Sequence, residues 1–376
     1  MNAEGVAEAG AKVAKGRHFE FIDGLRGVAA ASVVLFHIYG GTLKKPLAQV
    51  IPPPIGFLLE HGDLGVQVFF VISGFVIAHS LRHATITGRY IFNFALRRQV
   101  RLDPPYWSTL LLATANLWLP WLLHPERAKA PPPSGGQLLA HIFYLQDILG
   151  KGDVVVVFWT LCIEVQFYLF FIVLLAVAQR LGGSAIASDG VPGERAFLMV
   201  FAAPAAASLS YMALIQSRGP WFLPYWYMFT LGAGMAFVIE GRLRLRFIVG
   251  LGAMAVLVGV SRRAPEPFIA TLVAGGIYAA SRSDGLHRWL RQRPFQYLGA
   301  ISYSLYLVHY DVGFRFLNAG AKLTGESPYW ALIWATLGIA ASLVAAQLLH
   351  MMIERPSIRL AARLRHVTPS VPPSAA

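Results

Sequence analysis

The feature that most constrains this chain is a succession of about ten apolar blocks, separated by basic or Pro/Gly-rich segments. Most of the blocks are long enough to cross the hydrocarbon core of a bilayer as an α-helix, which takes about twenty residues. They lie at about 27–43, 56–81, 104–123, 154–179, 196–216, 222–240, 247–261, 267–281, 297–316 and 329–352. The sequence therefore predicts an all-α membrane protein, a bundle of about ten transmembrane helices.

The composition supports a chain embedded in lipid. Of its 376 residues, 56% are apolar and 14% are charged, and the mean hydropathy is +0.54. A soluble domain carries roughly a quarter charged residues, so an ordinary soluble enzyme is excluded, and the 12% of aromatic residues excludes a disordered chain. The single cysteine, Cys162, allows no intrachain disulfide and no multi-cysteine metal site, and no metal is expected.

The distribution of positive charge predicts the orientation of the bundle. The chain has 32 Lys and Arg against 19 Asp and Glu, a net charge of +13. With the N-terminus in the cytoplasm, 21 of the 32 fall in cytoplasmic segments and nine on the opposite side, in agreement with the positive-inside rule. Both termini are therefore expected in the cytoplasm. Because the basic residues are dispersed among short segments, membrane lipids are expected partners and nucleic acid is not.

Three regions are predicted along the chain. Residues 1–18 lack the apolar core of a cleaved signal peptide and form a cytoplasmic tail. Residues 19–357 form the transmembrane domain, and residues 358–376 form a second cytoplasmic tail. The moderately apolar segment 138–150 is expected to be an interfacial or re-entrant helix, because a crossing there would move every later basic segment to the opposite side.

Ionisable side chains inside the spans are functional candidates, because each is costly in lipid. In the first block, Arg26 and His37 are eleven positions apart, which places them on one helical face about 16 Å apart along the axis. Arg26 is expected at the cytoplasmic entrance and His37 about half a membrane deeper. The pair would suit an anionic substrate entering from the cytosol and a proton transfer inside. A charged helix end and a histidine bonded to a neighbouring helix would give the same pattern.

Two further spans carry polar stripes. In the fourth block, Glu164 must be protonated or face a cation or a polar cavity. It is a candidate partner of His37 that fixes the tautomer of the imidazole, as in acyl-transfer triads, although it would equally hold two helices together. In the ninth block, His309 lies at about the depth of His37, where it would line the same site or make an ordinary interhelical hydrogen bond. The stripes are Thr160, Glu164 and Tyr168, and Ser302, Tyr306 and His309.

The basic segment RRQVRLDPPYW follows the second span. Arg98 and Arg101 share a helical face there, and guanidinium groups bind phosphates bidentately. Any basic loop also satisfies the positive-inside rule, so this segment alone does not decide between phosphate binding and orientation of the chain in the membrane. Pro104 and Pro105 are expected to start a helix. Upstream, the Ser73-Gly74 pair inside a span would either open a cavity or permit close helix packing.

Taken together, these segments resemble acyltransferase family 3, a family of integral membrane acyltransferases that modify bacterial exopolysaccharides, O-antigens, nodulation factors and some antibiotics. The motifs stand in the family's order and cover nearly the whole chain, from about residue 19 to 357. The chain departs from the family at Asp103, where an aromatic residue is more common. The matching segments are DGLRG with the Arg-x10-His spacing of Arg26 and His37, GVQVFFVISGF, RRQVRLDPPYW, WTLCIEVQFYLF, LGAISYSLYLVH and the ERP of Glu354–Pro356.

The resemblance implies an acyl-CoA-dependent acyltransferase in the bacterial cytoplasmic (inner) membrane. The acyl-CoA, usually acetyl-CoA, is a co-substrate taken from the cytoplasm, and no cofactor is bound. The acceptor is a hydroxyl of a sugar or polysaccharide, which can be lipid-linked. The oligomeric state stays open, and a homo-oligomer is one of the alternatives. The resemblance implies His37 and Glu164 as the catalytic pair and Arg26, Arg98 and Arg101 as donor contacts. The residues expected to line the site or bind the acceptor are Ser73, Tyr106, Trp159, Tyr168, Tyr306 and His309.

Two mechanisms and one other function stay open on the sequence alone. His37 acts either as the base that activates the acceptor hydroxyl or as a nucleophile that carries the acyl group across the membrane. A transporter or flippase for an anionic or lipid-linked solute would also use His, Glu and Arg side chains inside the bundle. The sequence contains no corresponding pair of interrupted helices in its two halves, which favours the acyltransferase.

Overall fold

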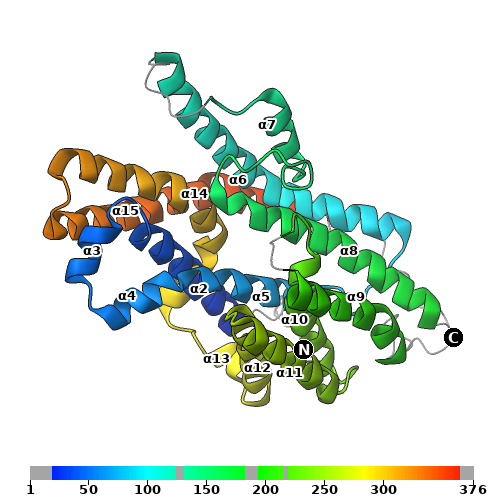
Figure 1. Cartoon of the computed structure of the whole chain (residues 1–376). Helices are drawn as coiled ribbons and strands as arrows, with labels where there is room; N and C mark the ends of the chain where they lie inside the picture. The colour runs from blue at the N-terminus through cyan, green and yellow to red at the C-terminus, as the bar shows by residue number, and fades with distance from the viewer. Residues whose placement is uncertain (1–18, 124–130, 183–193, 216–218, 365–376) are drawn as a thin grey trace, which may run out of the picture.

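The computed structural model describes residues 19–123, 131–182, 194–215 and 219–364, and this part of the chain contains helices and no strand. Ten of the described helices have 14 residues or more. Figure 1 shows them gathered into one bundle, with α14 and α15 side by side at one flank and α8 and α9 at another. They are α2 (Glu20–Tyr39), α5 (Gly65–Ser80), α6 (Gly88–Leu123), α8 (Trp159–Gly182), α9 (Glu194–Leu214), α10 (Trp226–Ile239), α11 (Leu245–Arg262), α12 (Glu266–Arg282), α14 (Arg293–Thr324) and α15 (Pro328–Leu349).

Six helical segments are long and apolar enough to cross a membrane, which makes the chain an integral membrane protein. They correspond to α2, α5, α8, α9, α11 and α15, and α10 is a shorter apolar helix. The remaining long helices are α6, α12 and α14; α12 has only 17 residues, and α6 includes the basic segment that follows the second span. The ten-span arrangement with cytoplasmic termini therefore stays a prediction.

The bundle has two ends that differ in charge. We call the end where α5 finishes and α6 begins the basic end, because Arg82, Arg97, Arg98 and Arg101 lie there. The end where α2 finishes and α5 begins is called the far end. The short helices α3 (Lys44–Val50) and α4 (Pro53–Glu60) connect α2 to α5 at the far end.

Small residues set the closest helix contacts. The long helix α14 packs along both α2 and α15, and α10 packs along α5. A Cβ atom on Gly74 of α5 would collide with the backbone of Phe229 on α10, and a Cβ on Gly232 of α10 would collide with the backbone of Val71 on α5. Small residues that let backbones approach are a common means of packing helices in lipid. Gly74 therefore permits close helix packing, which is one of the two alternatives predicted for the Ser73-Gly74 pair.

Helix α6 differs from the prediction that Pro104 and Pro105 begin a helix. The helix runs without a break through both prolines, so the basic segment before them is also helical. Prolines inside a helix remove backbone donors; beside this point the Tyr303 hydroxyl of α14 donates to the Leu102 carbonyl at 2.9 Å, which ties α6 to α14. The arginines of this segment therefore project from a rigid helix.

The boundaries of α2 differ from those of the predicted span. Helix α2 begins at Glu20 and is capped at Gly40, whereas the apolar block suggested a span over 27–43. His37 consequently lies in the last turn of the helix, and its depth in the membrane stays a prediction. Arg26 is nearer to the basic end, as predicted.

Two shorter helices bear on the remaining predictions. Helix α7 (Gly135–Ile142) has eight residues, about 12 Å of helix, which is too short to cross a bilayer. The C-terminal tail predicted from residue 358 starts as helix, because α16 (Arg355–Arg363) continues through this position and packs against α6. Residues 1–18, predicted as the N-terminal tail, lie outside the described residues.

Candidate active site

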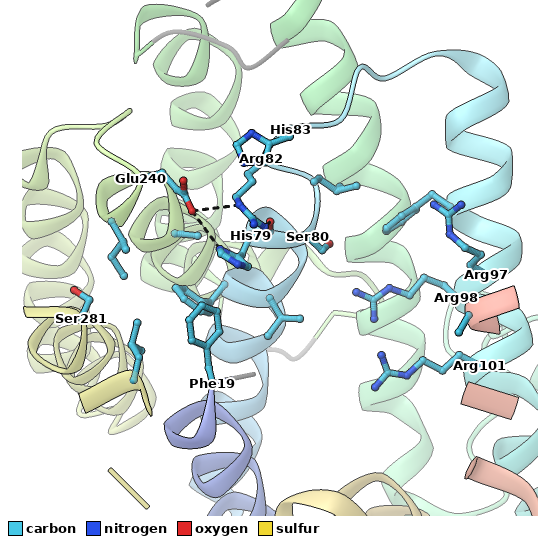
Figure 2. A pocket seen from close by; sticks show the side chains of 18 of the residues that line it. Phe19, His79, Ser80, Arg82, His83, Arg97, Arg98, Arg101, Glu240 and Ser281 are labelled. Atoms are coloured by element: carbon cyan, nitrogen blue, oxygen red, sulfur yellow. Dashed lines mark hydrogen bonds and ion pairs between the residues drawn. The ribbon is translucent and has the colours of Figure 1, made fainter. Parts of the chain in front are cut away.

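A large basic cavity opens at the basic end of the bundle. We call it the vestibule; its volume is about 1360 Å³. Figure 2 shows Arg97, Arg98 and Arg101 on one wall, with the Arg98 and Arg101 side chains extending towards the opposite wall. On that opposite wall Glu240 lies 3.4 Å from His79 and 3.5 Å from Arg82, so these groups partly neutralise one another.

Arg98 and Arg101 are positioned to receive an anion. Within the described part of the chain neither guanidinium has a carboxylate within 4.0 Å, whereas Arg26 lies 3.9 Å from Asp23. The Arg98 guanidinium lies over the Tyr168 ring, 4.3 Å from its centroid, which fixes its plane. Arg101 interacts electrostatically with both Arg98 and Arg26. Arg101 also interacts with Glu354, so three positive charges share one nearby carboxylate, and this excess favours a ligand with negative charge.

The vestibule leads to a smaller cavity in the middle of the bundle. This inner chamber has a volume of about 100 Å³ and shares Val76, Arg98 and Arg101 with the vestibule. The two arginines therefore stand at the junction of a wide basic opening and a narrow interior. The other polar side chains that line the inner chamber are Arg26, Ser73, Thr160, Glu164, Tyr168, Ser302, Tyr303, Tyr306 and Glu354.

Both polar stripes predicted from the sequence face the inner chamber. Thr160, Glu164 and Tyr168 of α8 all line it. Ser302 and Tyr306 of α14 line it from another side, and the Tyr306 and Thr160 hydroxyls are hydrogen-bonded at 2.8 Å. The helical spacing of polar residues thus identified two walls of the chamber correctly.

Glu164 is not the partner of His37 in this structure. Its carboxylate accepts hydrogen bonds from the Ser73 hydroxyl, at 2.9 Å, and from the Tyr168 hydroxyl. His37 bonds different groups, the Val33 carbonyl and His309. Glu164 therefore joins α5 to α8 and contributes a negative charge to the inner chamber.

His37 instead contacts His309, the other intramembrane histidine predicted at its depth. His309 is fully buried, and its Nδ1 lies 2.8 Å and 3.1 Å from the carbonyl oxygens of Tyr306 and Leu305. Carbonyls only accept, so Nδ1 of His309 carries the hydrogen and Nε2 is the acceptor. That Nε2 lies 3.1 Å from Nδ1 of His37.

These contacts determine the tautomer of His37. Its Nδ1 faces two acceptors, Nε2 of His309 and the Val33 carbonyl at 3.0 Å, so Nδ1 of a neutral His37 carries the hydrogen. Nε2 of His37 is then unprotonated and has an available lone pair. His309 thus orients His37 in the manner in which a carboxylate orients the histidine of an acyl-transfer triad.

Glu354 also lines the inner chamber, although it was not predicted as an ionisable residue inside a span. It was noted only as part of the ERP motif, yet its carboxylate is buried and accepts a hydrogen bond from the Ser304 hydroxyl at 2.6 Å. His350 contacts the same carboxylate at 2.9 Å. Both residues belong to a π-helical turn, His350–Glu354, a local widening often found at functional sites. Sequence periodicity gives no signal for such a turn.

Three expected lining residues do not line the inner chamber. His309 is buried beside His37, outside the lining. Tyr106 is fully buried and stacks on Tyr144, with ring centroids 4.6 Å apart. Trp159 lines a different cavity at the far end. Asp103, the departure from the family pattern, is buried and accepts a hydrogen bond from Tyr144 at 2.9 Å, which attaches the segment after α7 to α6. Among the described residues no group of three or more His, Cys, Asp or Glu suits a metal ion.

A helical membrane protein with a basic opening and an internal histidine pair is thus defined. The family described as "Acyltransferase domain" matches residues 19–351, most of the chain, and the protein therefore belongs to this acyltransferase family.

Relatives within the family are distant but extensive. Acyltransferase MdmB of Streptomyces mycarofaciens is 27% identical over 94% of this chain and 95% of its own length. BcsY of Komagataeibacter xylinus, named as a candidate membrane-bound transacylase, is 28% identical over 77% of this chain and 71% of its own. YrhL of Bacillus subtilis, named as a candidate peptidoglycan O-acetyltransferase, is 24% identical over 90% of this chain, which spans 55% of its length. No solved structure matches the chain.

Proposed function

We propose that the protein is an O-acyltransferase of the bacterial inner membrane, which moves an acetyl group from cytosolic acetyl-CoA to a hydroxyl of a sugar or polysaccharide acceptor. The observation that carries the proposal is the placement of Arg98 and Arg101 at the junction of the vestibule and the inner chamber. A donor that has phosphates at one end and a thioester on a thin arm at the other fits a wide basic cavity that narrows in this way.

The proposed reaction assigns one step to each group of residues. Arg98 and Arg101, with Arg26 deeper, bind the donor phosphates while the pantetheine arm extends through the inner chamber. Nε2 of His37 removes the proton from the acceptor hydroxyl as the hydroxyl oxygen attacks the thioester carbonyl. The carbon–sulfur bond breaks, the acceptor ester forms, and the CoA thiolate takes up the proton from His37.

The donor half of the proposal is tested by binding. Acetyl-CoA should raise the melting temperature of the detergent-solubilised protein, because a ligand that binds only the folded state stabilises it. The Arg98→Met variant should need about tenfold more acetyl-CoA for the same shift, since it loses a charge-assisted hydrogen bond. Arg89→Met is the matched control, because Arg89 is an exposed residue of the same helix. No shift with the unmodified protein would contradict the donor and favour a transporter.

The role of His37 is tested by transfer and by trapping. His37→Ala should retain the acetyl-CoA shift but lose acyl transfer in membranes; full transfer by this variant would disprove the assignment. Incubation with radiolabelled acetyl-CoA and no acceptor then separates the two mechanisms. Label that stays on the unmodified protein but not on His37→Ala supports an acyl-histidine relay, and absence of label supports direct attack.

A further inference from the structure

A third cavity, at the far end of the bundle, has no role in the donor half of the reaction. This far cavity has a volume of about 610 Å³. It is enclosed by the far ends of α5, α9, α10, α11 and α12, opposite to the vestibule. Its lining includes Asp63, Trp159, Tyr211, Tyr227, Arg262 and Glu266.

Three polar atoms that line the far cavity have no hydrogen-bond partner among the described residues. They are the hydroxyl of Tyr227, Nη2 of Arg262 and Oε2 of Glu266, and all three are buried. The Tyr227 side chain is 0% exposed. The Arg262 guanidinium is held in place, because its Nε donates to the Met212 carbonyl at 3.2 Å.

Unpaired buried groups of this kind are costly, because each loses its bonds to water without a replacement. Three of them on one cavity wall are accounted for if a ligand supplies the missing partners. Tyr227 and Glu266 interact electrostatically, so they lie close enough to contact the same ligand.

The far cavity adjoins the proposed reaction centre. Val66 lines both the far cavity and the inner chamber. Phe70 of the chamber contacts Trp159 and Tyr225 of the far cavity, with ring centroids 6.3 Å and 5.3 Å away, so a layer of side chains separates the two spaces. On the far side of this layer, Asp63 is near enough to His37 for their charges to interact.

The chemistry of the lining selects the ligand. Tyr227 and Arg262 offer hydrogens and Glu266 offers a lone pair, so a matching ligand both donates and accepts hydrogen bonds, as hydroxyl groups do. The charged residues of the lining, Asp63, Arg262, Arg263 and Glu266, sum to zero, which gives no preference for an ionic ligand. Trp159 and Tyr211 add aromatic rings against which an apolar ring face can pack.

We propose that the far cavity is the acceptor site and that it binds an uncharged, polyhydroxylated, sugar-like part of the acceptor. This inference rests on the proposed acyl transfer, since it assigns the second substrate of that reaction. The donor enters from the basic end and the acceptor from the far end, and the two meet at the layer formed by Val66 and Phe70, with Asp63 of the far cavity within electrostatic reach of His37.

The test uses a cysteine reporter in the full-length protein, reconstituted in nanodiscs. Ser261 is an exposed residue of the far cavity, and the native Cys162 is buried, so Ser261→Cys gives a single reactive thiol. Its rate of labelling by a maleimide is measured with maltotriose, cellotriose or chitotriose in solution, and separately with digalactosyldiacylglycerol in the nanodisc. We expect at least one of these uncharged glycans to slow labelling about tenfold at saturation.

Matched variants then locate the binding groups. Tyr227→Phe and Glu266→Gln, each made in the reporter protein, should weaken the protection about tenfold, because each removes one buried hydrogen-bonding group. Tyr329→Phe and Glu326→Gln are the controls, because both residues are exposed at the far end. The melting temperature of each variant without ligand establishes that it is folded.

The outcomes separate the acceptor site from the proposed function. Protection only by a soluble glycan or only by the glycolipid supports the inference and identifies the form of the acceptor. Absence of protection in both arms, or equal loss of protection in the control variants, overturns it. Failure of the donor half is recognised independently, because it appears as an absent acetyl-CoA shift in the unmodified protein.

Discussion

At the scale of single residues, the contact between His37 and His309 decides which nitrogen is available for chemistry. Two carbonyls fix the hydrogen of His309 on Nδ1, and His309 in turn fixes the hydrogen of His37 on Nδ1. A buried histidine thereby accepts the Nδ1 hydrogen of His37, as a carboxylate accepts that of the histidine in a triad, without adding a negative charge to the membrane interior.

We therefore expect His309 to be a positioning residue for His37. His309→Ala should reduce acyl transfer by about tenfold or more, since Nδ1 of His37 then keeps only the Val33 carbonyl as an acceptor and the ring is less firmly oriented, and should leave the acetyl-CoA melting shift in place. His309→Gln should recover part of the activity, because its side-chain oxygen can accept from His37. The measurement is initial transfer rate with a parallel melting curve; a purely structural role would lower the melting temperature of both variants without rescue by Gln.

Most of the chamber residues were predictable from the sequence, and the reason is periodicity. Arg26, Glu164 and Tyr306 stood out because a polar residue inside an apolar helix has few explanations, and Arg98 because it shares a helical face with Arg101 in a basic segment. The pairing of Glu164 with His37 is not observed, because Glu164 bonds Ser73 and Tyr168 instead, and residue spacing within one helix does not tell which side chains of other helices it meets. Contacts between helices distant in sequence, such as His37 with His309, have no local signal.

At the scale of elements, the crossing of α5 and α10 holds one wall of the inner chamber in place. Gly74→Ala should lower the free energy of unfolding by about 1–3 kcal/mol, because the added methyl group would force the two backbones apart. Gly275→Ala on α12 is the control: no atom of a neighbouring element lies within 4 Å of the added Cβ, so stability should be unchanged or slightly higher. Thermal melting of the two variants decides, and equal effects would contradict the packing argument.

The segment that follows α7 should respond to pH through Asp153, which lies outside the membrane-spanning helices. Burial and the nearby Asp147 charge raise the pKa of Asp153 to about 7. A raised carboxyl pKa favours the protonated form in the folded protein, so the penalty for ionising Asp153 grows as pH rises from about 4 and is complete above about 7. Asp153→Asn should therefore stabilise the protein at pH 8 by about 1 kcal/mol, after allowance for partial exposure, and by less at pH 5.

Melting curves of the Asp153→Asn variant and of the unmodified protein between pH 5 and pH 8 check this expectation. Asp284→Asn provides the control, because Asp284 is exposed and forms a surface ion pair with Arg288. A difference that shrinks as the pH rises would have the wrong sign and would contradict the raised pKa of Asp153.

Element boundaries were less predictable than element positions. The apolar blocks marked the long helices, but α6 starts well before its apolar part because arginines and prolines do not by themselves end a helix that packs against its neighbours. The π-helical turn at His350–Glu354 also extends a helix beyond its apolar block. In both cases tertiary packing, which the local sequence does not encode, sets the boundary.

At the scale of the whole molecule, the three cavities form a series from one end of the bundle to the other. The vestibule and the inner chamber share Arg98 and Arg101, and the inner chamber and the far cavity share Val66. The net charge of +13 therefore has two components. Most basic residues fall where the predicted cytoplasmic orientation requires them, whereas the few at the junction of the first two cavities belong to the proposed donor site.

This series predicts that the vestibule and the far cavity open on opposite sides of the membrane, and two matched serines test it. Ser281 lines the vestibule and Ser261 the far cavity, and each hydroxyl only bonds a carbonyl three residues earlier in its own helix. Since Cys162 is buried, a cysteine at either position is the single reactive thiol. A membrane-impermeant maleimide should label Ser261→Cys in intact cells and Ser281→Cys only after permeabilisation. Labelling of both from the same side would contradict the arrangement, and the reverse pattern would mean that the basic end faces outward, against the charge distribution.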